Sequence, residues 1–134
     1  MADGGKQIVF TEKAPKPLGT YSQAVVSPPG WRQVQLCGQI PLRSDGSLAL
    51  DSIESQTRQV FENIRSVAEA AGGTTSHITK LTVYLTNMEH LRVVNQIMPE
   101  YFQTPYPARS AVGVASLVAQ AEIEIDGVMH LPAN

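Results

Sequence analysis

The stretch DSIESQTRQVFENIRSVAEAAGG, residues 51–73, carries the clearest secondary-structure pattern in the chain. Asp51 and Glu54 have the spacing of a capping box, which predicts a helix start with Asp51 as its N-cap. Gly72 and Gly73 provide a left-handed stop at the other end. Between them, one set of apolar residues recurs at spacings of three, four and seven: Ile53, Val60, Ile64, Val67 and Ala71. The pattern predicts one amphipathic helix whose apolar side must be buried against another layer.

Strand patterns lie on both sides of this helix. Short runs rich in β-branched residues or with alternating polarity, separated by Gly- and Pro-containing turns, predict three strands before the helix and three after it. The predicted strands cover residues 7–10, 21–26, 31–38, 78–85, 109–115 and 121–129. We expect the second and third of these strands to form a hairpin across the turn at residues 27–30.

A second helix is predicted between the fourth and fifth strands. Residues 86–89 form a second capping box, and Pro99 should kink the helix or separate its last turn. Its apolar stripe is Leu91, Val94, Met98 and Phe102. The resulting order is βββαβαββ, an α+β fold with a mixed sheet and two helices on one face. The other face would be uncovered in a monomer, which favours a homo-oligomer.

Composition narrows the class of protein. With 134 residues, 43% of them hydrophobic, the chain fits a single domain spanning residues 1–134, and we expect residues 1–6 to be flexible. The net charge of −2 and the lack of a basic stripe disfavour nucleic-acid binding. No apolar run suits a signal peptide or a membrane span. The single cysteine, Cys37, agrees with a reducing compartment, so we expect a cytoplasmic protein.

Several kinds of chemistry lack their sequence signals. No His, Cys or acidic residues have metal-ligand spacing, and neither a Walker sequence nor a G-x-G-x-x-G motif is present. We therefore expect no metal site and no nucleotide-binding site. Cys37 has no adjacent base, so a buried strand cysteine is favoured over a nucleophile.

One arginine is a candidate ligand-binding residue. Arg109 opens an otherwise uncharged strand and follows Pro105 and Pro107, which restrict the backbone before it. A guanidinium on a stiff support can hold a planar carboxylate with two parallel hydrogen bonds. The segment indicates a site for a small organic acid; the alternative is a surface arginine after a turn.

Two further side chains could complete such a site. Glu124 lies on the last predicted strand, which could pair with the Arg109 strand, and its carboxylate could orient or deprotonate a water. The alternative is that Glu122, Glu124 and Asp126 form the solvent face of an amphipathic strand. Tyr21 could supply a phenol to a cleft, or be a buried aromatic residue with a bonded hydroxyl.

Six short motifs follow one another along the chain: GTYSQA at 19–24, CGQIP at 37–41, QTRQV at 56–60, VN at 94–95, PARS at 107–110 and EIEI at 122–125. Together they resemble the Rid family of reactive imine/enamine deaminases, also called the YjgF or L-PSP family. The resemblance implies a chorismate-mutase-like fold and a homotrimer with a central barrel, outer helices and clefts between neighbouring subunits. It also implies cofactor-free hydrolysis of 2-imino acids, formed from 2-enamino acids, to 2-keto acids and ammonia.

The resemblance implies roles for individual residues. Arg109 matches the arginine that grips the substrate carboxylate, Glu124 the acid that positions the hydrolytic water, and Tyr21 the tyrosine that lines the cleft. Further substrate contacts are implied for Cys37, Gly38, Asn95 and Ala111, the last through its backbone N–H.

Among the departures from the family pattern, three bear on the cleft. Thr20 replaces a usual proline, which we expect to loosen the approach to Tyr21. Cys37 replaces a common serine and is a poorer hydrogen-bond partner. Residues 116–120 replace a more usual Leu-Pro-Lys-Gly turn, which removes a lysine near the rim.

Other functions stay open at this point. The same arginine would suit a trimer that binds a 2-keto acid without turnover, or a deaminase for a larger ring-cleavage product such as 2-aminomuconate. The family is also named for RNA cleavage, but the acidic balance of this chain argues against that activity.

Overall fold

The computed structural model describes residues 3–134 and has the element order βββαβαββ that the sequence predicts. The strands are β1 Gln7–Val9, β2 Ala24–Val26, β3 Arg32–Gln39, β4 Ile78–Leu85, β5 Ala108–Gly113 and β6 Ile123–Leu131. The helices are α1 Ile53–Ala70 and α2 Leu91–Ile97. Short 3-10 turns precede β4, α2 and β6, and another follows α2. The mixed α+β class is confirmed.

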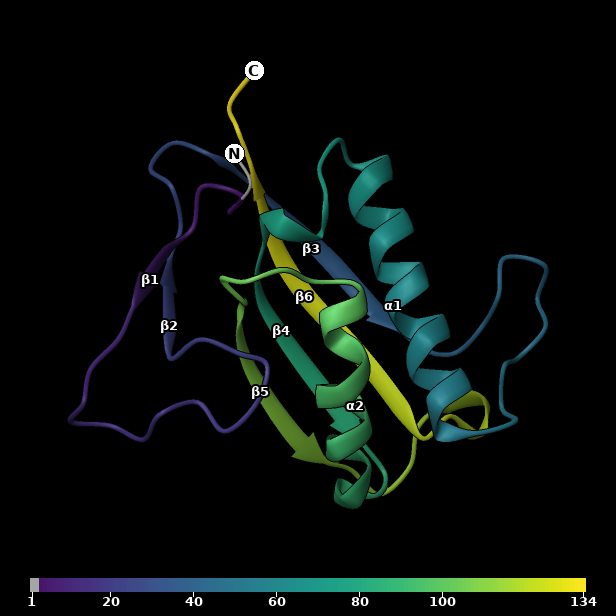
Figure 1. Ribbon diagram of the computed structural model, residues 1–134. Coiled ribbons are helices and arrows are strands. Elements are labelled where there is room, and N and C mark those ends of the chain that lie inside the picture. The colour runs from purple at the N-terminus through teal and green to yellow at the C-terminus, as the bar shows by residue number, and fades with distance from the viewer. Residues whose placement is uncertain (1–2) are drawn as a thin grey trace.

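Four strands form the main sheet in the order β3-β6-β4-β5. Strands β4 and β5 are parallel, and the other pairs are antiparallel. Both helices lie against one face of this sheet, as Figure 1 shows. Half-buried side chains form the opposite face, which we call the open face: Lys80, Thr82, Tyr84, Glu124 and Asp126. The prediction of two helices on one face is confirmed.

The predicted hairpin between residues 21–26 and 31–38 is wrong. Strand β2 pairs with β1 instead, and β3 pairs with β6. The three residues of β2 cannot match the eight of β3, whereas β6 has nine and gives β3 a partner along its length. The β1–β2 ribbon meets the main sheet at a bridge between Ser22 and Ala108, beside β5 (Figure 1).

The core lies between the main sheet and the two helices. Alternate residues of β4 and β6 point into it and are fully buried. From α1 it takes Val60, Phe61, Ile64 and Ala68, and from the second helical segment Val93, Val94, Ile97 and Met98. Val67, predicted to be buried, is 40% exposed, because its side of α1 borders the loop at residues 39–44 rather than the sheet.

The helix ends differ from the predicted capping boxes. Ser52, not Asp51, caps α1, because its hydroxyl accepts a hydrogen bond from the Ser55 N–H at 3.0 Å. Asn87 caps the turn before α2 in place of the Thr86–Glu89 pair. The predicted effect of Pro99 is confirmed: α2 ends at Ile97 and residues 98–100 form a separate 3-10 turn. The glycine stop after α1 is also confirmed, since Gly72 has φ +102°.

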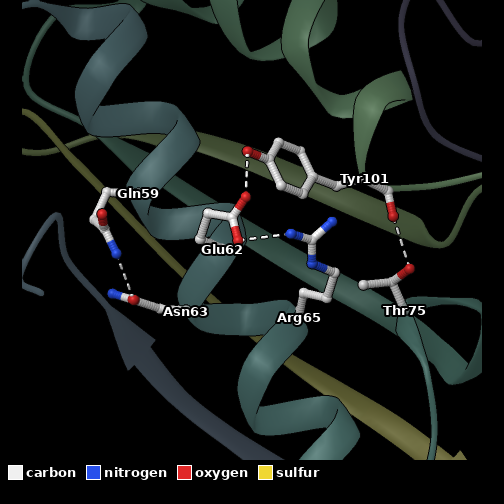
Figure 2. Close-up of polar contacts among 6 residues, drawn as sticks. All are labelled: Gln59, Glu62, Asn63, Arg65, Thr75 and Tyr101. Carbon is white, nitrogen blue, oxygen red and sulfur yellow. Dashed lines mark hydrogen bonds and ion pairs between the residues drawn. The ribbon is translucent and has the colours of Figure 1, made fainter. Parts of the chain in front are cut away.

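Polar contacts fix the segment after α2 to α1 (Figure 2). The Tyr101 hydroxyl donates to Glu62 at 3.0 Å, and Arg65 donates to the same carboxylate at 2.7 Å. The Thr75 hydroxyl donates to the Tyr101 carbonyl oxygen at 2.7 Å. These contacts hold the carboxyl end of the second helical segment in place, and that segment supplies Asn95 to the candidate site.

The N-terminal residues within the described range pack on the fold. Met1 and Ala2, part of the segment expected to be flexible, lie outside the described residues. In the turn at residues 3–6, Lys6 Nζ donates to the Ser76 carbonyl oxygen at 2.6 Å and the side chain is buried. Within residues 3–134 we find no helix of the length and apolarity that a bilayer crossing requires.

Candidate functional site

Arg109 lies near the start of β5 and reaches toward α2. Its backbone is opposite Leu81 on β4, whose side chain is buried beneath the helices. Residues opposite each other share a face, so the Arg109 side chain lies on the helix-covered side. There, Arg109 Nη1 donates to Asn95 Oδ1 at 3.0 Å and to Thr20 Oγ1 at 2.9 Å. The structure therefore brings Arg109 and Asn95 together, 14 positions apart in sequence.

Tyr21 packs against the same guanidinium. Arg109 Cζ lies 5.1 Å from the centre of the Tyr21 ring, and the Tyr21 hydroxyl accepts a hydrogen bond from the Leu18 N–H at 3.0 Å. A ring face attracts a cation through its quadrupole, so the tyrosine steadies one side of the arginine. Tyr21 is thus an aromatic residue with a bonded hydroxyl that also borders Arg109.

Thr20 was expected to loosen this loop, and the structure contradicts that expectation. Its N–H donates to Asn95 Oδ1 at 3.1 Å, a bond that proline cannot make, and its hydroxyl contacts both Asn95 and Arg109. A Cβ at the preceding Gly19 would lie 2.5 Å from Asn95 Oδ1, so the glycine allows the close approach. Thr20 therefore ties the loop to Asn95 and Arg109, contrary to the effect expected from the sequence.

The Arg109 guanidinium is half-buried and has no carboxylate partner among residues 3–134, where the ion pairs are Arg58–Glu100 and Arg65–Glu62. Burial lowers the pKa of Arg109, although arginine keeps its charge in proteins. A partly desolvated cation without a counter-ion is stabilised when an anion binds. The arrangement suits a small organic anion.

Glu124 belongs to a second group of residues. It lies opposite Tyr84 on the open face of the sheet. A Cβ at Gly38 would overlap with the Glu124 carboxylate, 2.8 Å from its Cδ, so Gly38 makes room for the acid. The pairing of β3 with β6 is irregular between Leu36 and Gln39, which places this glycine against Glu124.

Cys37 precedes Gly38 in the irregular part of β3. The sequence favours a buried cysteine, but Cys37 is exposed, and its Sγ accepts a hydrogen bond from Gln39 Nε2 at 3.2 Å. Leu36, the preceding residue of β3, points into the core, so the alternation of the strand places Cys37 on the opposite, exposed side of the sheet. Ala111 lies on β5, two residues beyond Arg109, half-buried against the core.

The expectation that the Glu124 strand pairs with the Arg109 strand is wrong. Strand β4 lies between β6 and β5. Arg109 shares a row with Leu81 on the helix side, whereas Glu124 shares a row with Tyr84 on the open face. Within one chain the two residues therefore do not face a common ligand.

Glu122, just before β6, and the β6 residues Glu124 and Asp126 are not a freely solvated row. Glu122 accepts a hydrogen bond from Gln56 Nε2 at 2.9 Å, and Asp126 accepts one from the Tyr84 hydroxyl at 3.0 Å. The Asp126 bond raises the pKa of Tyr84. All three acids are half-buried, which favours a specific environment over a plain solvent face.

Comparisons with known proteins identify relatives of this chain and of its fold. A model of the Endoribonuclease L-PSP family matches residues 11–131. A RutC family protein of Pyrococcus horikoshii is 40% identical over 126 residues, which cover 93% of this chain and 98% of the relative. A 2-iminobutanoate/2-iminopropanoate deaminase of Dermatophagoides farinae is 37% identical, covering 92% and 95%. The crystal structure of YyfB from Yersinia pestis, a Rid-family protein of unknown function, matches with a TM-score of 0.86 at 26% identity, covering 95% and 99%.

Proposed function

We propose that this chain, which belongs to the Rid (YjgF, or L-PSP) family, hydrolyses 2-imino acids to 2-keto acids and ammonia. The observation that carries the proposal is the half-buried Arg109 guanidinium. Its Nη1 is held by Thr20 and Asn95, while Nε and Nη2 have no partner among residues 3–134. That free edge has the geometry for side-on pairing with a carboxylate. The name of the Dermatophagoides farinae relative, 2-iminobutanoate/2-iminopropanoate deaminase, supports the same substrate class.

The reaction needs little from the protein beyond placement. Water adds its oxygen to the electrophilic imine carbon and gives a tetrahedral carbinolamine. A proton then moves from that oxygen to the nitrogen, and the C–N bond breaks. The products are ammonia and a 2-keto acid. Fixing the carboxylate and placing one water near the carbon lowers the entropic part of the barrier. Arg109 does the first and the Glu124 carboxylate, as general base, does the second.

The site is shared between subunits in this proposal. Because Arg109 and Glu124 lie on opposite faces of one sheet, a cleft that uses both must combine two chains. We propose a homotrimer in which the open faces pack around a central barrel, so that Arg109 of one subunit meets Glu124 of the next. Gly38 then leaves room for the carboxylate, Tyr21 and Asn95 steady the arginine, and Cys37 and the Ala111 N–H line the cleft.

Ammonia and keto-acid release from freshly generated 2-iminopropanoate tests the function. We expect Arg109→Ala to lose the acceleration that the wild type shows. Arg92→Ala is the matched control, because Arg92 is an exposed arginine on α2. Full activity of Arg109→Ala would overturn the assignment. Saturable keto-acid binding by the wild type without turnover would instead identify a metabolite-binding protein, and bulkier imino acids would show whether a larger product is preferred.

A further inference from the structure

We infer that Thr20 is a positioning residue for Arg109, whose hydroxyl holds one end of the guanidinium so that the other edge is presented to a carboxylate. The inference rests on the proposed function and adds a residue that positions Arg109 for binding the carboxylate of the substrate. It follows from the contacts of Thr20, Asn95 and Arg109.

The Thr20 hydroxyl lies between the guanidinium and the Asn95 amide. It accepts a hydrogen bond from Arg109 Nη1 at 2.9 Å and lies 3.0 Å from Asn95 Oδ1, to which it donates. A hydroxyl has one proton and two lone pairs, so it can do both at once. Met98 Sδ lies 3.2 Å from the same hydroxyl, but a thioether is a weak acceptor and competes poorly with the amide oxygen.

Asn95 alone cannot hold the arginine. Three donors reach its Oδ1: the Thr20 N–H at 3.1 Å, the Thr20 hydroxyl at 3.0 Å and Arg109 Nη1 at 3.0 Å. A carbonyl oxygen has two lone pairs, so these donors share its capacity. The Thr20 hydroxyl supplies the second oxygen acceptor for the two N–H groups of Nη1. Met98 Sδ also lies 3.7 Å from Nη1, but a thioether is a weak acceptor and does not replace either oxygen.

The geometry leaves a defined edge for the ligand. With Nη1 occupied, the remaining guanidinium donors are on Nε and Nη2, which have no partner among residues 3–134. Those two nitrogens form the side-on fork that binds a carboxylate through parallel bonds. Fixing the guanidinium before binding removes part of the ordering cost from the binding step.

The backbone at Thr20 is held by contacts that do not use its hydroxyl. The neighbouring Gly19 lies against the Asn95 amide, and the Ser22 N–H donates to the Pro107 carbonyl oxygen at 3.0 Å. The Ser22 hydroxyl donates to the Tyr106 carbonyl oxygen at 2.6 Å. Thr20→Val, which keeps the shape and the N–H, therefore removes the hydroxyl while the loop keeps its other anchors.

A measurement without ligand tests the positioning directly. In the full-length wild type, ¹⁵N-edited NMR of arginine side chains should show slow rotation of the Arg109 guanidinium, assigned by loss of its signal in Arg109→Lys. Thr20→Ser should keep the slow rotation and Thr20→Val should speed it. Equal rotation in all three proteins would overturn the inference. If Thr20→Val fails to fold, Thr20→Ala, which also lacks the hydroxyl, takes its place.

Calorimetric measurement of the binding of pyruvate and of its uncharged amide tests whether Thr20 strengthens carboxylate binding by Arg109. We expect Thr20→Val to weaken pyruvate binding about threefold to tenfold, the effect of one hydrogen bond, and to raise KM for 2-iminopropanoate by a similar factor with kcat nearly unchanged. Thr20→Ser should restore both values. Binding of the amide should not change, and the exposed Thr86→Val should behave as wild type.

The outcomes separate this inference from the proposed function. If the wild type binds pyruvate but releases no ammonia, the deaminase proposal fails and the binding comparison still decides on Thr20. If Thr20→Val binds pyruvate as the wild type does, or if Thr20→Ser binds as weakly as Thr20→Val, the inference fails alone. Equal weakening for pyruvate and its amide would show a structural role and overturn it. If the wild type binds no pyruvate, the inference fails, and ammonia release still decides on the deaminase proposal.

Discussion

Arg109 and Glu124 lie on opposite faces of the main sheet, with strand β4 between their strands. Arg109 is opposite Leu81, beneath the helices, and Glu124 is opposite Tyr84, on the open face. A carboxylate bound to the arginine is therefore out of reach of the acid of the same chain. In the proposed function, assembly is needed for catalysis and not only for covering the sheet.

Two apolar residues of α1 should differ sharply in their contribution to stability. Ile64 is 1% exposed in the core, whereas Val67 is 40% exposed. Ile64→Ala should lower the free energy of unfolding by about 2–5 kcal/mol, because it removes buried methyl groups and leaves a cavity. Val67→Ala should change it by less than about 0.5 kcal/mol. Urea unfolding of both variants measures the difference, and equal losses would contradict the packing of α1.

Gly38 should be required for activity more than for folding. Gly38→Ala places a Cβ against the Glu124 carboxylate, which must move. We expect imine hydrolysis to fall about 10- to 100-fold, as expected when a catalytic group is displaced by about 1 Å. Gly113→Ala is the matched strand control, since the nearest atom to its Cβ would be 3.4 Å away. Unchanged turnover in Gly38→Ala would argue against a role for Glu124 in that position.

Lys6 should make stability rise with pH in the alkaline range. Burial lowers its pKa to about 8 from 10.5, an effect only partly opposed by Asp3. Between these values the unfolded chain binds more protons than the folded one, so the free energy of unfolding increases with pH there. Thermal unfolding measured at pH 7.5, 9 and 10 should show this rise in stability for the wild type. The rise should be absent in Lys6→Met. An identical pH dependence of the two proteins would contradict the burial of a charged Lys6.

The order of the elements follows from local patterns, while their pairing does not. The α1 periodicity, its Gly72 stop and the break at Pro99 depend on neighbouring residues and are readable from sequence. The partner of β3 depends on strand lengths across the sheet, so the turn at residues 27–30 gave a misleading hairpin. The solvent exposure of Val67 likewise depends on the loop at residues 39–44, whose position cannot be predicted from the periodicity of the helix.

The candidate site shows the same division. Arg109 can be identified as a candidate ligand-binding residue from its own segment, because it is the one charged residue of an apolar strand and follows two prolines. Its contacts with Thr20, 89 positions away, arise only when α2, the Gly19 loop and β5 pack together. The family resemblance points to Tyr21, Asn95 and Glu124, but the opposite facing of Arg109 and Glu124 depends on β4 lying between their strands, which the motifs do not encode.

Activity of mixed assemblies is the most direct test of a deaminase site shared between subunits. Arg109→Ala and Glu124→Gln are purified separately and also co-expressed with different tags, and ammonia release from 2-iminopropanoate is measured for each preparation. Each variant alone should be inactive. The mixed assemblies should recover about a quarter of wild-type activity, because random association joins an intact Arg109 with an intact Glu124 in about one cleft in four. No recovery in mixed assemblies, or full activity of either variant alone, would contradict the account.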